Sequence, residues 1–329
     1  MLVVDPTKFP IRRKIQDSQA TYVWSERRET VAETRLVARL DALAVPPAWD
    51  PAFFAASGRC KVQALAIDGS GKEQAIYAAW FREKRETDKF ADLWAFGAAL
   101  PNIRRRAVGI LRDDQSDPFS KAVAACVLTI DEGALRVGSR TYRQSNGTVG
   151  AVSLQGKHIE VGDRSVELSF TAKGGKERFV RLCQPDLIAY LKARKVKANE
   201  DLFAVLLGSL SRKVRPRHIS QWLADNASQL KAADLRLNPY TAKSFRLWHA
   251  SAAAFAHEQS TDGKATIKAM SQAAAKRLGN TATVARNSYI HPDVLAAELL
   301  KKRSKIWNAA RARPFVARAD AALLAFLSS

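Results

Sequence analysis

The sequence predicts an α+β protein of two domains, a small β-rich domain at the N-terminus and a larger, mostly helical domain after it. Short runs in which apolar and polar residues alternate dominate residues 1–84, and this period is typical of strands. In residues 85–329 the apolar spacing is mostly helical, except between Arg136 and Leu182, where the period falls back towards two. Residues 81–87 are highly charged, and we place the domain boundary between residues 84 and 85.

In the N-terminal domain we expect a small antiparallel sheet with short helices. The alternating runs predict strands at Ala20–Trp24, Lys61–Ile67 and Gln74–Trp80. The sequence Asp68-Gly69-Ser70-Gly71 between the last two is a hairpin signal. Thr34–Leu43 carries one apolar helical stripe, and the following Pro46 and Pro47 end it, because proline cannot continue a helix.

In the C-terminal domain the pattern predicts helices around a three-stranded β element. The first helices are expected at Lys89–Leu100, Pro101–Leu111 and Pro118–Thr129. The β element follows Arg136, with turns at Ser145–Thr148 and Lys173–Lys176. From Gln184 onward we expect helices again, with breaks at Pro216 and near Asn238-Pro239.

The stretch Leu278–Pro292 predicts the end of one helix, a turn, and a second short helix that carries Tyr289. Gly279 can adopt the left-handed conformation that closes a helix. Thr281 can cap the next helix, and Pro292 is expected to prevent that helix from continuing. A tyrosine near a helix end usually serves packing, so this stretch alone does not establish a site.

The charge of the chain indicates an anionic partner. The 329 residues include 53 Lys+Arg against 32 Asp+Glu, which gives a formal net charge of +21, and the basic residues are spread along the whole length. This distribution favours an extended anion that much of the fold contacts, and nucleic acid is the first candidate. A basic but otherwise ordinary enzyme is the second.

Other features exclude several classes of protein. No run of about eighteen apolar residues is present, and the N-terminus lacks the apolar segment of a signal peptide. The three cysteines, Cys60, Cys126 and Cys183, are widely separated and form neither a metal-ligand spacing nor a disulfide framework. We therefore expect a cytoplasmic protein with no membrane association.

Several residues of the C-terminal domain suit phosphate chemistry. Arg136 and Arg246 can present guanidinium forks to the non-bridging oxygens of a pentacoordinate phosphate. Lys173 or Lys176 can protonate a departing 5′ oxygen, and Tyr289 can attack the phosphorus. Each residue alone is compatible with an ordinary surface or packing role. Together they fit a transesterification in which side chains neutralise the charge, so that no metal, cofactor or ATP is required.

These residues lie in segments through which the chain resembles the type IB DNA topoisomerases, in particular the small poxvirus-like branch found in bacteria. The resemblance covers nearly the whole chain, at Ile11-Arg12, Tyr22–Trp24, Val45–Trp49, Gly71–Tyr77, Lys89-Phe90, Leu100-Pro101, Arg136–Gly138 with Tyr142, Phe170–Lys173, Lys243–Arg246 and Gly279–Pro292. A match over so many segments is more specific than any single motif.

The resemblance implies a catalytic set of three cations and one nucleophile, Arg136, Lys173, Arg246 and Tyr289. It selects Lys173 over Lys176 as the general acid. Asn280 stands at the position of the family's active-site histidine, nine residues before Tyr289. Asparagine keeps a neutral donor for a phosphate oxygen but cannot be protonated, and capping of the next helix is its alternative role. His249 and His291 are expected to be structural.

The resemblance also implies a DNA-binding set, Lys72, Gln74, Tyr77, Tyr142 and Lys243. Gln74 and Tyr77 match DNA-contacting residues of the family's N-terminal domain, and Tyr142 matches a position at the DNA surface. Ala75 replaces an aromatic residue of the poxvirus-like pattern, so a preference for one pentamer is not expected to carry over.

By this resemblance, two lobes clamp duplex DNA, and a tyrosine cuts one strand and becomes linked to its 3′ phosphate. Rotation and rejoining would then relax positive and negative supercoils. We expect a monomer that acts on double-stranded DNA and associates with the nucleoid.

A tyrosine recombinase is the main alternative, because it shares the catalytic fold and the Arg, Lys, Arg, Tyr chemistry. Recombinases usually carry histidine three residues before the second arginine, where this chain has Lys243, and their N-terminal domain is helical. A non-catalytic DNA-binding protein would account for the charge but not for the ordered set of residues.

Overall fold

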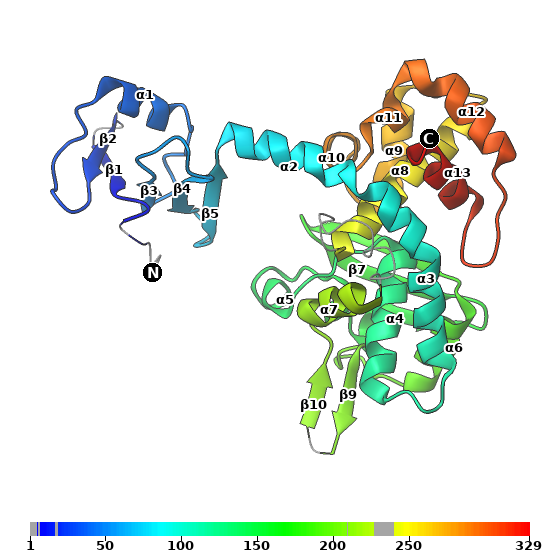
Figure 1. Cartoon of the computed structure of the whole chain (residues 1–329). Coiled ribbons are helices and arrows are strands. Elements are labelled where there is room, and N and C mark those ends of the chain that lie inside the picture. The colour runs from blue at the N-terminus through cyan, green and yellow to red at the C-terminus, as the bar shows by residue number, and fades with distance from the viewer. Residues whose placement is uncertain (1–4, 6, 17–18, 209, 227–239) are drawn as a thin grey trace. The chain divides into compact units, whose positions relative to one another are not determined.

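The computed structural model describes residues 5, 7–16, 19–208, 210–226 and 240–329, without the side chains of Thr87, Thr141, Tyr142, Ser145 and Leu207. The chain divides into two compact units, Met1–Lys89 and Phe90–Ser329 (Figure 1). The boundary that we expected between residues 84 and 85 falls inside helix α2 (Ala79–Ala91). The charged residues 81–87, which predict a linker, are therefore helical.

The N-terminal unit contains a five-stranded antiparallel sheet in the order β2-β1-β3-β4-β5 and one helix, α1 (Thr34–Asp41). The strands are β1 (Ile11–Gln16), β2 (Gln19–Trp24), β3 (Ala52–Phe54), β4 (Val62–Ile67) and β5 (Glu73–Tyr77). The predicted strands are present as β2, β4 and β5, with the expected hairpin between β4 and β5, but β5 ends at Tyr77, and Ala79 and Trp80 belong to α2. We did not predict β1 and β3. The first is rich in basic residues and the second has only three residues, so neither gives a clear alternating signal.

The core of the N-terminal unit explains why one basic residue of β1 points inward. Ile11 and Phe54 are fully buried. Arg13, which is only 4% exposed, donates from its guanidinium to the carbonyl oxygens of Val45 (2.6 Å) and Trp49 (2.6 Å). Arg13 thereby fixes the proline-containing loop to the sheet.

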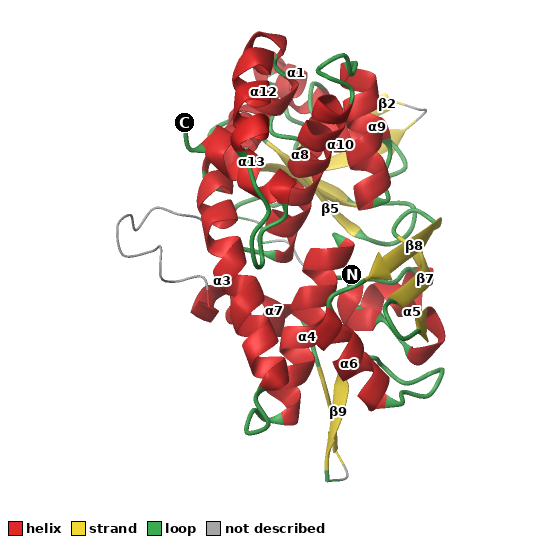
Figure 2. Ribbon diagram, turned by 90° about the vertical axis from the view of Figure 1, so that its right-hand side faces the viewer, coloured by secondary structure: helices red, strands yellow, loops and turns green. Residues whose placement is uncertain are grey.

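The C-terminal unit is mostly helical (Figure 2). Its helices are α3 (Leu93–Arg112), α4 (Pro118–Gly133), α5 (Arg140–Asn146), α6 (Pro185–Arg194), α7 (Pro216–Asn226), α8 (Ala242–Ser260), α9 (Ile267–Leu278), α10 (Ala282–Ser288), α11 (Pro292–Leu295), α12 (Leu300–Ala309) and α13 (Arg318–Leu327). Short 3₁₀ helices cover Ala151–Ser153, Gly156–His158 and Ala297–Leu299.

Two helices form the centre of this unit. In α4 every residue from Ala122 to Asp131 is buried, and α3 and α6 pack against it (Figure 1). Helix α8 lies between α9 and α13 and also contacts α3 and α4. The candidate active site lies at the carboxyl ends of α4 and α9 and at the beginning of α8.

Two β elements complete the unit. The predicted three-stranded element is present as an antiparallel sheet of β6 (Ile159–Val161), β7 (Val166–Ala172) and β8 (Lys176–Leu182). A second hairpin, β9 (Ala204–Leu207) with β10 (Leu210–Lys213), lies where we expected only helices. Its strands have only four residues each, too few for a reliable period.

Pro101 lies inside α3, where we expected one helix to end and another to begin. Proline cannot donate to the carbonyl four residues back, at Gly97. The helix continues because its flanking residues Leu100 and Ile103 are buried in the core. A side chain at Gly97 is excluded, since a Cβ there would lie 2.1 Å from the Trp248 indole of α8.

The expected breaks at Pro216 and Pro292 are present: each proline is the first residue of a helix, α7 and α11, where the missing N–H costs nothing. One expected turn is corrected. Ser145 and Asn146 are the last residues of α5, and Gly147 follows them at φ 64°, so this stretch is not a turn between strands. Asn238-Pro239 lies outside the described residues. Among the helices described, none is long and apolar enough to cross a membrane.

Candidate active site

Arg246 lies on the first turns of α8 and is 3% exposed. Its Nη1 donates to the carbonyl oxygens of Ala134 (2.5 Å) and Leu278 (3.1 Å). Its Nε and Nη2 atoms are also buried and have no hydrogen-bond partner of ordinary geometry among the described residues, although the Tyr289 hydroxyl interacts with the guanidinium. Burial and the nearby charge of Arg136 lower the pKa of Arg246 to about 10, so the side chain is still a cation at neutral pH. A buried cation with two unused donors can bind an anion.

Arg136 follows the end of α4, which Ala134 closes in the left-handed conformation at φ 49°. The backbone around Arg136 is fixed, because Ala151 N–H donates to its carbonyl oxygen at 2.9 Å. The segment that follows Arg136 packs directly against Gly150, because a Cβ on Gly138 would lie 2.6 Å from the Cα of Gly150. The half-buried Arg136 side chain lines the same small cavity as Arg246.

Tyr289 is the residue at which α10 ends, and its N–H donates to Ala285 at 3.0 Å. The guanidinium carbon of Arg246 lies 5.0 Å from the centroid of the Tyr289 ring. Burial by itself raises the pKa of the Tyr289 hydroxyl, but the charges of Arg246, Arg136 and Lys243 outweigh burial and lower the pKa below its ordinary value. The phenol is therefore easier to deprotonate than a free tyrosine.

Asn280 occupies the turn between α9 and α10, which Gly279 opens at φ 63°. Thr281 is the N-cap residue of α10, and its Oγ1 accepts from Val284 N–H at 3.2 Å. Helix capping therefore does not account for Asn280. Both polar atoms of its side chain are buried, and neither has a hydrogen-bond partner in the described part of the chain. The side chain has a free amide donor, as phosphate contact requires.

Lys173 and Lys176 belong to the hairpin of β7 and β8. The turn depends on Gly174 and Gly175, which have φ values of 84° and 71° that other residues rarely adopt. Lys173 is exposed at the tip and directly follows Ala172, which lines the small cavity next to Arg136. Arg136, Arg246 and Tyr289 thus lie together. Among the described residues, no hydrogen bond joins the Lys173 ammonium to any of these three side chains.

The DNA-binding candidates divide between the two units. Lys72, Gln74 and Tyr77 belong to the N-terminal hairpin, where the Gln74 amide nitrogen donates to Asp68 at 2.6 Å. Lys243 is exposed on the first turn of α8. The side chain of Tyr142 lies outside the described residues, although its backbone belongs to α5.

The two histidines near the site have hydrogen-bond partners in the fold. His249 Nε2 lies 2.7 Å from Oδ1 of Asp131, and both side chains are buried. The backbone N–H of His291 donates to Ser251 Oγ at 2.9 Å, and its Nδ1 accepts from Asp293 N–H at 3.2 Å.

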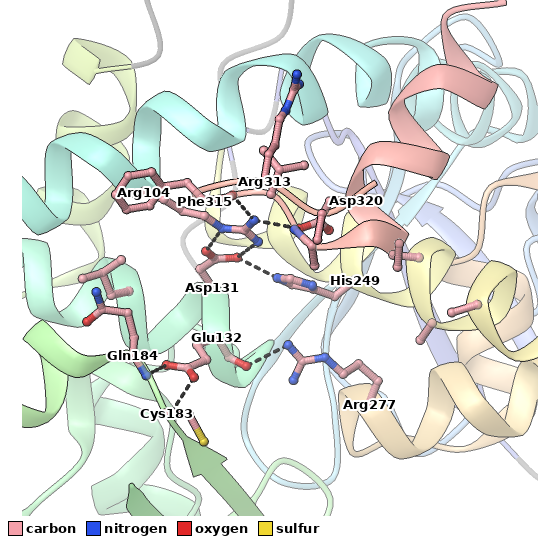
Figure 3. A pocket seen from close by; sticks show the side chains of 18 of the residues that line it. Arg104, Asp131, Glu132, Cys183, Gln184, His249, Arg277, Arg313, Phe315 and Asp320 are labelled. Atoms are coloured by element: carbon pink, nitrogen blue, oxygen red, sulfur yellow. Dashed lines mark hydrogen bonds and ion pairs between the residues drawn. The ribbon is translucent and has the colours of Figure 1, made fainter. Parts of the chain in front are cut away.

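Behind the site, a separate cavity of about 750 Å³ is lined by an ionic network (Figure 3). Arg104 of α3 donates to Asp131 and to Asp320, each at 2.7 Å. Asp320 also accepts from the Trp248 indole N–H at 2.7 Å. The network joins α3, α4, α8 and α13. Its members gave no sequence signal, because the partners are far apart along the chain.

Comparison with known proteins identifies the family of the chain. The sequence model of the eukaryotic DNA topoisomerase I catalytic core matches residues 78–312. The chain belongs to this family. A DNA topoisomerase 1B of Acanthamoeba polyphaga mimivirus is 25% identical over 169 residues, which cover 50% of this chain and 49% of the relative. The chain thus spans about half the length of the curated relative that it matches.

A solved structure, the XerH site-specific recombinase bound to a palindromic difH substrate in a post-cleavage complex, is similar with a TM-score of 0.40 and 15% identity. The similarity covers 62% of this chain and 51% of that one.

Proposed function

We propose that this protein is a type IB DNA topoisomerase that relaxes supercoiled DNA through a transient covalent link to Tyr289. One observation carries the proposal. Arg246 is a buried cation with two unused donors, it lies beside Arg136, and its guanidinium carbon is 5.0 Å from the Tyr289 ring. Family membership supports the assignment.

In the proposed reaction the Tyr289 oxygen attacks a phosphorus atom of the DNA backbone, and this attack produces a pentacoordinate phosphate. Arg136 and Arg246 donate to its non-bridging oxygens, where negative charge develops, and such preorganised donors are among the largest contributions to catalysis. The bond from phosphorus to the 5′ oxygen breaks, and a new ester joins the Tyr289 oxygen to the 3′ phosphate. The number of ester bonds is unchanged, so the reverse attack by the 5′ hydroxyl rejoins the strand without ATP.

Lys173 is the proposed general acid. An alkoxide is a poor leaving group, so the 5′ oxygen must gain a proton as the bond breaks. The Lys173 ammonium is exposed at the hairpin tip, where a bound DNA strand can approach it. Asn280 is proposed to donate its amide hydrogen to a non-bridging oxygen, and its unpaired buried amide supports this role.

The proposed substrate is double-stranded DNA, clamped by the two units of a monomer that associates with the nucleoid. The net charge of +21 supports extensive phosphate contact. We propose that Lys72, Gln74, Tyr77, Tyr142 and Lys243 belong to this contact surface.

Site-specific recombination is the second candidate, and one structural observation weighs against it. A recombinase protomer exchanges a helix that follows its nucleophile with a neighbouring protomer. Here α13, near the C-terminal end of the described chain, packs into its own core through the buried residues Leu323 and Phe326. Asp320 of the same helix pairs with Arg104 of the same chain.

The test is relaxation of plasmids of both supercoil signs in EDTA, without ATP and without any recombination site. A topoisomerase gives a ladder of relaxed topoisomers of unchanged length. Recombinant products, or a strict need for a divalent cation, would contradict the proposal.

A further inference from the structure

Arg178 of β8 and Arg246 of α8 each bridge the carboxyl ends of the same two helices, α4 and α9. Nη2 of Arg178 donates to the carbonyl oxygens of Gly133 (3.2 Å) and Arg277 (2.5 Å). Nη1 of Arg246 donates to those of the next residues, Ala134 and Leu278. The end of α4 is followed by Arg136, and the end of α9 is followed by Asn280.

A third arginine extends the pattern. Arg277 donates from Nη2 to the carbonyl oxygen of Glu132 at 2.7 Å (Figure 3). Three successive carbonyls at the end of α4, those of Glu132, Gly133 and Ala134, therefore accept from three different arginines. The last carbonyls of a helix have no partner within the helix and carry its negative dipole end, so cations bind well there.

Arg178 differs from Arg246 because its terminal nitrogens are committed to the protein. Its Nη1 donates to the backbone carbonyl oxygen of Lys276 at 3.0 Å, and its Nη2 makes the two hydrogen bonds described above. Burial and the charges of Arg277 and Arg136 lower its pKa to about 10. Arg178 is therefore repelled by the neighbouring cations. Its hydrogen bonds to the ends of α4 and α9 offset this repulsion.

The Arg178 side chain lies close to Gly279, the residue before Asn280. A Cβ at Gly279 would lie 2.7 Å from Cδ of Arg178 and 2.9 Å from its Nε. The Arg178 side chain therefore lies directly against the turn that presents Asn280. Arg178 also pairs with Phe170 in the β7–β8 hairpin that carries Lys173, so one residue contacts three segments of the proposed site.

We propose that Arg178 is a positioning residue for DNA cleavage, which holds the Arg136 segment and the Asn280 segment at a fixed separation. This inference rests on the proposed function. It assigns Arg178 no contact with DNA. The planar fork is essential to the role, because it donates to two carbonyls from one nitrogen and to a third from the other. Lysine keeps the charge but has no such planar geometry.

The experiment measures single-turnover cleavage at saturating DNA for Arg178→Ala and Arg178→Lys, with DNA affinity and melting temperature for each. Both variants are expected to cleave about ten- to a hundredfold more slowly, the effect of a small misplacement of reacting groups, while DNA affinity stays the same. Arg181→Ala, an exposed arginine on the same strand, is the matched control and should cleave normally. Full activity of Arg178→Lys would overturn the proposal, because charge alone would then suffice.

A double-mutant cycle separates positioning from general support of the fold. If Arg178 acts through Asn280, Arg178→Ala should cost much less in an Asn280→Ala background than in the wild type. Equal losses in both backgrounds, or losses that follow the melting temperature alone, would overturn the proposal. If Arg178→Ala does not fold, Arg178→Lys, which keeps the packed stem, is used in the same cycle. No covalent adduct from the wild type would contradict the proposed function itself. An adduct with unchanged rates in the Arg178 variants would contradict only the positioning role.

Discussion

The guanidinium carbon of Arg246 lies 5.0 Å from the centroid of the Tyr289 ring, and this proximity connects the charge of the site to its nucleophile. A cation beside a phenol stabilises the phenolate and lowers the pKa of the hydroxyl. The same cation can stabilise the phosphate that the phenolate attacks. One residue can thus assist both partners of the reaction.

The pH dependence of cleavage follows from this arrangement. Because the pKa of Tyr289 is lowered from its ordinary value, the single-turnover cleavage rate should rise with pH and level off below about pH 10, the pKa of a free tyrosine. Lys243→Gln removes one of the charges that lower this pKa and should move the rise to higher pH. A profile identical in the wild type and in Lys243→Gln would contradict this account.

Substitutions of Asn280 test its proposed contact with the phosphate. Asn280→Ala should lose about 10²-fold or somewhat more in cleavage rate, as expected for one donor to developing charge. Asn280→His should retain substantial activity through an imidazole N–H. Asn280→Asp should be the least active, because a carboxylate repels the phosphate and offers no donor. The measurement is the single-turnover cleavage rate of the three variants, each with a melting temperature equal to that of the wild type. Normal activity of Asn280→Asp would indicate a different role for Asn280.

The general acid can be identified with a modified substrate. Lys173→Ala should slow cleavage of ordinary DNA by orders of magnitude and should be rescued when sulfur replaces the 5′ bridging oxygen, because a thiolate leaves without a proton. Lys176→Ala is the matched control from the same hairpin and should need no rescue. Rescue of Lys176→Ala and not of Lys173→Ala would assign the acid to Lys176.

The ion pairs of Asp131 in the buried network behind the site should make the stability of the fold decrease at acid pH. Burial alone raises the pKa of Asp131, but Arg104 and His249 outweigh it and hold the pKa well below its ordinary value. This stabilisation is fully present above about pH 4 and is lost as the pH falls towards the folded-state pKa.

Asp131→Asn should therefore lower the free energy of unfolding by about 3–5 kcal/mol at neutral pH, since it removes one of the two carboxylates that pair with the buried Arg104 guanidinium. Urea unfolding measures this, and Asp163→Asn, in an exposed ion pair with Lys192, is the control and should change stability little. Equal effects of the two substitutions would contradict the account.

The sequence predicted the fold class and most strands of the N-terminal sheet because alternation there is strong. It failed where tertiary packing decides the outcome. Pro101 ends a helix by local rules, yet α3 continues because its flanking residues are buried. The charged residues 81–87 resemble a linker, yet they form part of α2.

The candidate site shows the same division. Tyr289, Arg136 and Arg246 stand in recognisable segments, and the structure brings them together. Arg178 and the Asp131–His249 pair could not be found from spacing, since their partners are separated by up to 118 positions. A residue that donates to backbone carbonyls requires no particular side chain in its partner and so leaves no motif.

The most direct test of the central claim is denaturation of a reaction of the protein with end-labelled duplex DNA in EDTA. We predict that label at the 5′ end of the cut strand becomes protein-linked, that label at its 3′ end is released on a fragment with a free 5′ hydroxyl, and that Tyr289→Phe forms no adduct while it still binds DNA. An adduct that persists in Tyr289→Phe would contradict the assignment of Tyr289 as the nucleophile, and an adduct that carries the 3′-end label would contradict the proposed link to the 3′ phosphate.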